Sequence, residues 1–301
     1  MQKPSLAISH ASISSMGYYN DCSKKWEFKY IYKLPERTIL GMKIGSTNHA
    51  ILESVNTWIK YKKTEPDKAY FLNEIEHLTK VSFPLEIFAK EKRGSKAEHE
   101  LSEEEFCVKQ RLEILEQLKK ICSIYIDVAS RDFKEIVLIE KDHVFDVNGT
   151  PFKMVTDAVV RFKDNSLRVI DYKTKAKSSE DVAILQLVSY GLGVKDLLKE
   201  DVDGLEQWDF IRKAEPELRI HKVDMDKFEN YSNVLKEEAE SFWKGVHGKL
   251  FTRNMRSMFC GPTKCDYWNV CMNPGTLEKE LESVADFHKD VVDNLENRRT
   301  R

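Results

Sequence analysis

The segment from Phe152 to Lys175, FKMVTDAVVRFKDNSLRVIDYKTK, places the tightest constraint on how this chain can fold. Its first part, 152–162, is rich in Val, Phe and Met, and its second part, 166–174, alternates as a strand does. Between them lies Lys163-Asp164-Asn165, and asparagine tolerates the left-handed conformation that a three-residue hairpin turn needs. The segment therefore predicts an antiparallel hairpin.

The register of this hairpin decides which charges meet. If Phe162 lies opposite Ser166, then Asp157 lies opposite Asp171, and such pairs are about 4.5–5.5 Å apart. Asp171 and Lys173 share a face because side chains alternate along a strand. Two close carboxylates repel each other unless a proton or a cation lies between them, and Mg2+ prefers carboxylate oxygens. The hairpin predicts either a metal site or a salt bridge on a solvated sheet face.

Composition excludes several classes of protein. The 301 residues, 41% hydrophobic and 33% charged, suffice for one large domain or two modest ones with a real core. The sequence contains no run of about 18 apolar residues, so no membrane span is predicted. The N-terminus has no signal-peptide pattern, so we expect a cytoplasmic protein. The net charge of −2 excludes a globally basic nucleic-acid binder.

The remaining elements are predicted from periodicity and turn residues such as Asn148-Gly149. The predicted helices are 43–62, 101–131, 179–194 and 224–245. The predicted strands are 135–147, 151–162, 166–174 and 217–223. The stretch 64–100 predicts only short helical pieces, and 200–214 is predicted to be irregular. Strands followed by crossover helices indicate a mixed α/β sheet flanked by helices.

Three cysteines, Cys260, Cys265 and Cys271, crowd into twelve residues among Gly, Pro and aromatic residues. Thiols this close predict metal or cluster binding, but a fourth ligand is missing locally. Cys22, far away in sequence, would complete the four thiolates that an iron–sulfur cube requires. Structural zinc more often recruits paired Cys-x2-Cys halves, so the two kinds of site remain open.

Two predicted helices carry polar pairs one turn apart, His49 with Glu53 and Gln186 with Tyr190. A lone helical histidine is more often structural or exposed than catalytic, and a His and a Glu one turn apart can simply hydrogen-bond. These pairs alone predict no site.

Taken in order, these residues resemble the RecB-like branch of the PD-(D/E)XK nuclease superfamily, in particular its iron–sulfur-bearing exonucleases. That branch includes the nuclease domain of the AddB helicase-nuclease subunit, CRISPR-associated spacer-acquisition nucleases, and phage and eukaryotic single-strand exonucleases. The resemblance runs over most of the chain. The residues that carry it are His49 in GSTNHAILE, Asp157 in MVTDAVV, Asp171 and Lys173 in VIDYKT, Gln186 and Tyr190 in QLVSY, and Cys22 with the C-terminal triplet.

The resemblance implies a fold and a domain organisation. The fold is a restriction-endonuclease-like α/β core, in which a mixed sheet flanked by helices has an antiparallel hairpin that carries the active site. We expect one nuclease domain over 1–275, with a helical insertion at about 64–131 and its terminal segments joined by the cysteine cluster. A charged helical tail would follow over 276–301.

The resemblance also implies a metal-dependent DNA exonuclease. His49, Asp157, Asp171 and the backbone carbonyl of Tyr172 would hold one or two Mg2+ or Mn2+ ions, and Lys173 would orient the attacking water. The implied catalytic residues are Asp157, Asp171, Lys173, Gln186 and Tyr190.

Other implied roles lie around that centre. Gln186 and Tyr190 would border the metal site or contact the DNA backbone, and Glu53 could orient the His49 imidazole. The implied ligands of a 4Fe-4S cluster, with zinc as the alternative, are Cys22, Cys260, Cys265 and Cys271.

The implied substrate is single-stranded DNA with free ends, in recombination, repair or phage DNA metabolism. A helicase, a single-strand-binding protein or a recombination protein could be a partner. Basic and aromatic residues between Lys24 and Lys33 could steer and stack on a strand, or could simply pack around the cluster. The alternatives are an endonuclease or spacer-processing nuclease that needs partners, a non-catalytic single-strand binder, and a zinc-bound structural protein.

Overall fold

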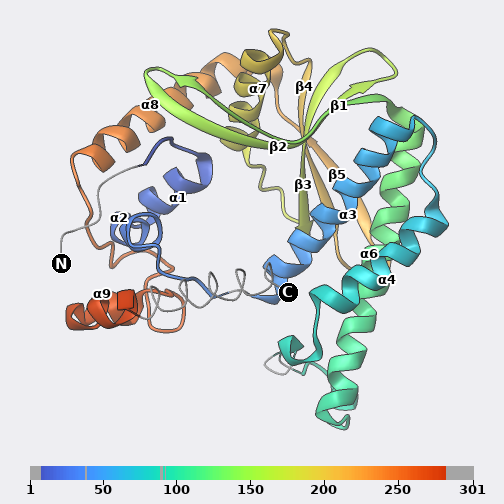
Figure 1. The fold of residues 1–301 in the computed structure, drawn as a ribbon, viewed down its shortest axis with the longest axis horizontal. Coiled ribbons are helices and arrows are strands. Elements are labelled where there is room, and N and C mark those ends of the chain that lie inside the picture. The colour runs from blue at the N-terminus through green and yellow to red at the C-terminus, as the bar shows by residue number, and fades with distance from the viewer. Residues whose placement is uncertain (1–7, 38, 89–90, 92, 283–301) are drawn as a thin grey trace, which may run out of the picture. The chain divides into compact units, whose positions relative to one another are not determined.

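The computed structural model describes residues 8–37, 39–88, 91 and 93–282 (Figure 1). The chain divides into two compact units. We call residues 38–145 and 154–235 the sheet unit, and residues 1–37, 146–153 and 236–301 the terminal unit. The predicted single domain over 1–275 stays a prediction. Most of the predicted tail, 276–301, lies outside the described residues. The described part of the tail is helical from 277 to 282.

A five-stranded mixed sheet has the order β1-β2-β3-β4-β5. The β2–β3 and β4–β5 pairs are antiparallel, whereas β3 and β4 run parallel. The strands are β1 (Phe133–Val147), β2 (Thr150–Phe162), β3 (Leu167–Lys175), β4 (Gly204–Ile211) and β5 (Glu217–Lys222). The predicted mixed α/β class is therefore confirmed.

The central hairpin has the predicted turn and register. Asn165 adopts a left-handed conformation with φ of 67°, and the Phe162 amide donates to the Ser166 carbonyl at 2.9 Å. The ladder pairs Arg161 with Leu167 and ends at Ala158 and Ile170. Asn148 and Gly149 also have positive φ, as the predicted turn between β1 and β2 requires.

Strand β4 corrects the prediction that 200–214 is irregular. It lies between β3 and β5, and every residue after Gly204 is buried. A strand buried on both faces shows no alternation. Its charges are neutralised by neighbours, because Glu206 lies 3.0 Å from Arg168 and Asp209 lies 2.6 Å from Lys175. Two charged residues within eight concealed a central strand.

Helices cover both faces of this sheet (Figure 1). The large apolar cluster joins one sheet face to α3, α4 and α6, whereas α7 contacts β3 and β4 from the other face. The helices are α3 (Leu40–Lys62), α4 (Lys68–Ser82), α5 (Lys96–His99), α6 (Glu103–Asp132), α7 (Ile184–Leu198) and α8 (Phe228–His247), and α8 continues into the terminal unit.

Two predictions about helices were wrong. The stretch 64–100 was expected to hold only short pieces, but it contains the 15-residue helix α4, which Asp67 caps at the amides of Ala69 and Tyr70. Helix α7 begins at Ile184 rather than at 179. The hydroxyl of Ser179 instead accepts a hydrogen bond from Lys175, so this segment forms a loop on the sheet.

The terminal unit gathers short helices from both ends of the chain. An aromatic cluster fills its interior, where the Trp26 ring stacks on Phe251 and meets Phe242 edge-on. Ala11 forms an isolated parallel bridge with Phe152. The helical segments are α1 (Ile13–Asp21), α2 (Ser23–Trp26), a π-helix (Glu27–Ile31) and α9 (Trp268–Met272).

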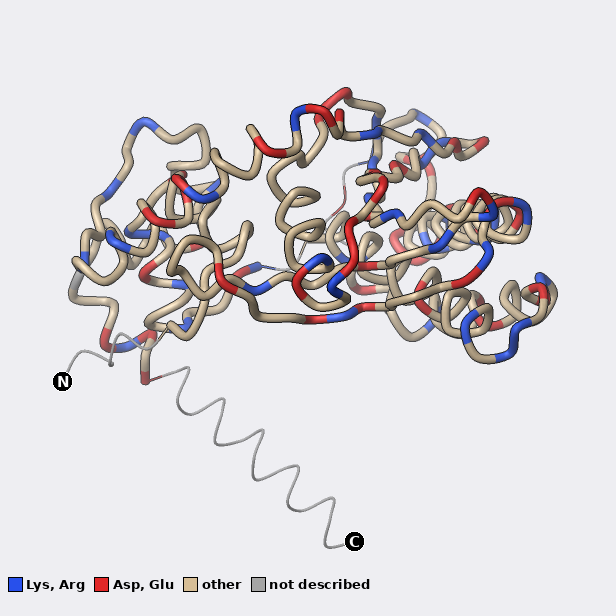
Figure 2. Tube along the Cα trace, turned by 90° about the horizontal axis from the view of Figure 1, so that it is seen from above, with Lys and Arg blue, Asp and Glu red and all other residues tan. Residues whose placement is uncertain are grey.

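Two surface properties follow from the described residues. None of the helices in this part of the chain is both long and apolar enough to cross a membrane. Basic and acidic residues are interspersed along most of the tube in Figure 2.

Gly193 on α7 should not tolerate a side chain. A Cβ atom there would lie 2.5 Å from the Met154 sulfur and 2.8 Å from the Phe145 ring. We expect Gly193→Ala to lower the free energy of unfolding by about 1–3 kcal/mol, measured by urea denaturation. The control is Gly45→Ala in α3, where nothing lies within 4 Å and a gain of about 0.5–1 kcal/mol is expected. Equal stability of both variants would contradict close packing at Gly193.

Candidate metal and active site

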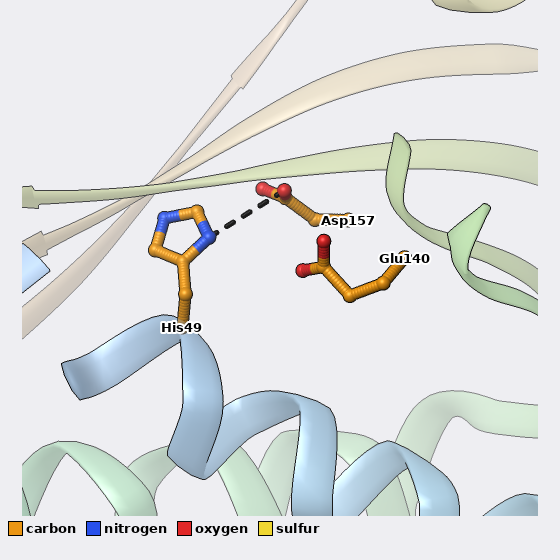
Figure 3. Close-up of side chains that lie close together, drawn as sticks. All are labelled: His49, Glu140 and Asp157. Atoms are coloured by element: carbon orange, nitrogen blue, oxygen red, sulfur yellow. Dashed lines mark ion pairs between the residues drawn. The ribbon is translucent and has the colours of Figure 1, made fainter. Parts of the chain in front are cut away.

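A histidine and two carboxylates from three elements of the sheet unit meet beside the hairpin (Figure 3). His49 of α3, Glu140 of β1 and Asp157 of β2 each offer one ligand atom, and these atoms lie within 4.8 Å of one another. His49 Nδ1 is 3.5 Å from Asp157 Oδ1. The structure thus brings together two residues predicted from sequence and one, Glu140, that was not.

Glu140 takes part because the backbone of β1 departs from a strand conformation at this residue. Its φ is 41°, which is left-handed and uncommon for any residue other than glycine. Such a residue interrupts the regular direction of side chains, and Figure 3 shows its carboxylate beside Asp157. No sequence pattern signals this, because glutamate has no special preference for positive φ. The position could have been found only from the three-dimensional path of β1.

Four predicted residues converge on the neighbouring part of β3. Lys173 Nζ lies 2.9 Å from Asp171 Oδ2 and donates a hydrogen bond to Oδ1 at 3.1 Å. Lys173 also donates to Gln186 Oε1 at 3.3 Å. Gln186 Nε2 donates to Asp171 Oδ1 at 3.2 Å and to the Tyr190 hydroxyl at 2.6 Å. The spacing of Gln186 and Tyr190 on α7 therefore places both beside the carboxylate and lysine of β3.

Asp157 connects the two groups of residues. The β2–β3 ladder stops at Ala158 and Ile170, and one step further the Asp157 carboxylate replaces a backbone acceptor. Its Oδ2 accepts from the Tyr172 amide at 2.6 Å, while Oδ1 faces His49. Asp157 thus holds the end of the hairpin in register. The Tyr172 carbonyl as a metal ligand stays a prediction.

Burial and mutual repulsion favour protons on these acids. Burial, together with the charge of Asp157, raises the pKa of Asp171 to about 6, although Lys173 opposes the shift. Burial raises the pKa of Glu140 to about 7, with help from the charges of Asp157 and Glu53. For His49, burial acts to lower the pKa, but the Asp157 carboxylate outweighs it and the net shift is upward.

Glu53 does not have the role that the sequence suggested. Its side chain is exposed on α3, and it acts on the site only through its charge, which raises the pKa of Glu140. Within the described residues, the carboxylate that interacts with the His49 ring is Asp157. The spacing of one helical turn predicted proximity but not contact.

The donor set fits a divalent cation. Asp171 is fully buried, and among the described residues the one cation that the structure places on its Oδ2 is Lys173, at 2.9 Å. Three carboxylates, those of Glu140, Asp157 and Asp171, gather beside one lysine, Lys173, and they repel one another unless protons or a cation lie between them. Carboxylate oxygens with one imidazole suit Mg2+ or Mn2+.

Two buried amides fix helix α3, and with it His49, on β3. Asn48 Nδ2 donates to Thr174 Oγ1 at 2.9 Å, and Asn56 Nδ2 donates to the Tyr172 hydroxyl at 3.2 Å. Both asparagines are fully buried. Because they bond one strand from positions on both sides of His49, they determine where the imidazole lies along the hairpin.

A comparison with protein families agrees with this geometry. The model of the PD-(D/E)XK nuclease superfamily matches residues 10–272, which is most of the chain. The chain belongs to this superfamily. Nucleases of the superfamily use divalent metal ions, which the His49, Glu140 and Asp157 group can hold.

One solved structure supports the fold assigned to this chain. A putative exonuclease from Eubacterium rectale is similar with a TM-score of 0.50 and 12% sequence identity, over 82% of this chain and 85% of that chain. A structure named SSO0001 has a TM-score of 0.31 and 11% identity, over 69% of this chain and 98% of that chain. Its TM-score is too low to support the fold. No curated protein matches this PD-(D/E)XK chain.

Metal binding by the nuclease should strengthen as pH rises. A cation must displace protons from Asp171 and Glu140, whose pKa values are raised to about 6 and about 7. We expect the Kd for Mn2+ to fall about tenfold or more between pH about 5.5 and about 8, with proton release, in titration calorimetry. Glu140→Gln should weaken binding and flatten this dependence, whereas Glu74→Gln, at an exposed position of α4, should not. A Kd independent of pH would contradict the shifted acids.

Proposed function

We propose that the protein is a RecB-like, metal-dependent DNA exonuclease whose catalytic residues are Asp157, Asp171, Lys173, Gln186 and Tyr190, with His49 and Glu140 completing the metal site. The observation that carries the proposal is the convergence of the Asp171–Lys173 pair with the His49, Glu140 and Asp157 group on one hairpin. An isolated ion pair would explain the lysine but not the accumulation of carboxylates around it.

Each side chain then has a definable task. A bound divalent ion lowers the pKa of a water ligand and neutralises charge on the phosphate. Lys173, held 2.9 Å from Asp171, orients the attacking water and offsets the negative charge that develops on the phosphate. Gln186 bonds both Asp171 and Lys173, so it fixes the angle between them.

Tyr190 supports Gln186 as a neutral hydroxyl. Burial, reinforced by the charge of Asp171, raises the Tyr190 pKa far above its usual value. The hydroxyl therefore keeps its proton near neutral pH, and it accepts a hydrogen bond from the Gln186 amide at 2.6 Å. This hydrogen bond fixes the orientation of the Gln186 amide relative to Asp171 and Lys173.

Digestion of DNA tests the proposal directly. With Mg2+, linear single-stranded DNA should be degraded while a covalently closed circle of the same sequence survives. Asp171→Asn should reduce the rate by about a thousandfold or more without unfolding the protein, because it removes a ligand and the partner of Lys173. The matched control is Asp201→Asn at an exposed position. Cleavage of the circle would indicate an endonuclease, and cleavage by Asp171→Asn would refute the site.

The four predicted cluster cysteines support a second part of the proposal. Cys22, Cys260, Cys265 and Cys271 line one cavity of about 30 Å3 in the terminal unit. All four are free and partly buried. We propose that they bind a 4Fe-4S cluster, which would join the two ends of the chain within this unit.

Cys22→Ser should lose both the cluster and stability. Cys22 lies between α1 and α2, far in sequence from the other three cysteines, so its loss opens the link between the chain ends. We expect less iron per protein, a weaker visible absorption and a lower Tm. The control is Cys107→Ala in the core of the sheet unit, which should keep its iron despite any loss of stability. Full iron content in Cys22→Ser would refute this ligand.

Single-strand contact is better placed near the cysteines than on the first helices. Trp26 is fully buried, and Lys24 and Lys29 form ion pairs with Glu27 and Glu36. These side chains therefore pack in the terminal unit rather than offering a stacking surface.

The segment 249–265 has the required chemistry. It contains Lys249, Arg253, Arg256 and Lys264 but no acidic residue, and Phe259 is 53% exposed. Cations beside an exposed ring suit a phosphate backbone with bases that can stack. Faster digestion of linear single strands than of linear duplex would support this choice of substrate.

A further inference from the structure

A buried polar cluster on β4 has no part in the mechanism above. The Asp209 carboxylate is fully buried. Lys175 Nζ lies 2.6 Å from its Oδ2, His221 Nε2 lies 3.2 Å from the same oxygen, and Gln207 Nε2 donates to Oδ1 at 2.9 Å. Burying such a charge is costly even when it is paired, so the cluster calls for a reason beyond filling space.

The cluster lies on the same sheet face as the active site, one strand away. In the parallel ladder, Gln207 pairs with Asp171 and Asp209 pairs with Lys173. Paired residues in a sheet direct their side chains to the same side. Gln207 and Asp209 are therefore the immediate lateral neighbours of the carboxylate–lysine pair.

The cluster holds the loop that leads from β3 into α7. Lys175 Nζ donates to Ser179 Oγ and to the Asp181 carbonyl, both at 3.2 Å. Gln207 Nε2 donates to the same Asp181 carbonyl at 3.1 Å, and Gln207 Oε1 accepts from the Ala183 amide at 2.9 Å. Four hydrogen bonds thus fix 176–183 on the sheet.

These bonds also define where α7 begins. Ala183 occupies its N-cap position, and no side chain caps the helix there. Serine or aspartate usually performs this task, but Ser179 and Asp181 lie outside the helix. Gln207, from the neighbouring strand, instead bonds the amide of the N-cap residue. Gln186 lies three residues after Ala183 in the sequence, so its position depends on where α7 begins.

We propose that Gln207 and Asp209 are positioning residues of the active site. Gln207 fixes the start of α7, and Asp209 holds Gln207 and Lys175 in place, so that Gln186 reaches Asp171 and Lys173 together. The inference rests on the proposed nuclease function of the same site. Neither residue touches the reacting phosphate, and both act through Gln186.

A double-mutant cycle tests this route of action. Gln207→Met preserves volume but removes all three hydrogen bonds of the side chain. On linear single-stranded DNA with Mg2+, it should lower kcat roughly 10- to 100-fold with KM little changed, because a small misplacement is costly. The double variant Gln186→Met, Gln207→Met should be no slower than Gln186→Met alone. Losses that multiply would overturn the proposal, as would an unchanged kcat in Gln207→Met.

Two controls separate positioning from loss of fold. Gln117→Met on α6 makes the same chemical change away from the site and should leave kcat unchanged. Hydrogen exchange in Gln207→Met should rise over 176–190 but not in α3 or α6. A rise throughout the sheet unit would instead show a merely structural role and overturn the inference.

A milder variant remains informative if Gln207→Met does not fold. Asp209→Asn keeps an acceptor for Gln207 but removes the charge that holds Lys175. It should show a smaller loss of kcat and the same non-additivity with Gln186→Met. Should the wild-type protein cleave no DNA, the proposed function fails, whereas the exchange of 176–190 still decides whether Gln207 fixes the start of α7.

Discussion

Repulsion among buried carboxylates is the constraint on which the rest of the site depends. Asp171 is fully enclosed, Asp157 lies at the end of the same hairpin, and Glu140 approaches from β1. An ionised carboxylate isolated from water costs several kcal/mol, and the raised pKa values of Asp171 and Glu140 express that cost. The arrangement needs a proton or a cation, and a single lysine cannot neutralise three acids.

The fold withstands this repulsion because β3 is bonded on both faces. On one side, the buried amides Asn48 and Asn56 of α3 reach Thr174 and the Tyr172 hydroxyl. On the other, Lys175 of β3 bonds Ser179 and the Asp181 carbonyl in the loop before α7. Groups that must remain close against their charges require such support, since ligands held loosely would separate.

The sequence predicted the parts of the site that depend on residues close together in the chain, and it missed a part that depends on the three-dimensional path of another strand. A three-residue turn fixes register locally, so the approach of Asp157 to Asp171 followed from Asn165 and alternation alone. Gln186 came from its resemblance to a family pattern. Glu140 could not be found, because its approach depends on its own left-handed backbone conformation in β1. Nothing within a few residues of Glu140 distinguishes it from other glutamates on a strand.

The buried charges of β4 explain both why the strand was not predicted and how it is proposed to act on the site. A strand with Glu206 and Asp209 among its eight residues looks unfit for the centre of a sheet, because an unpaired buried charge would unfold it. It is tolerated there because Arg168 and Lys175 of β3 provide the opposite charges. Those cross-strand bonds tie β4 to the strand that carries Asp171 and Lys173. Asp209, one of the two charged residues that concealed the strand, is therefore also one of the residues through which β4 is proposed to influence the site.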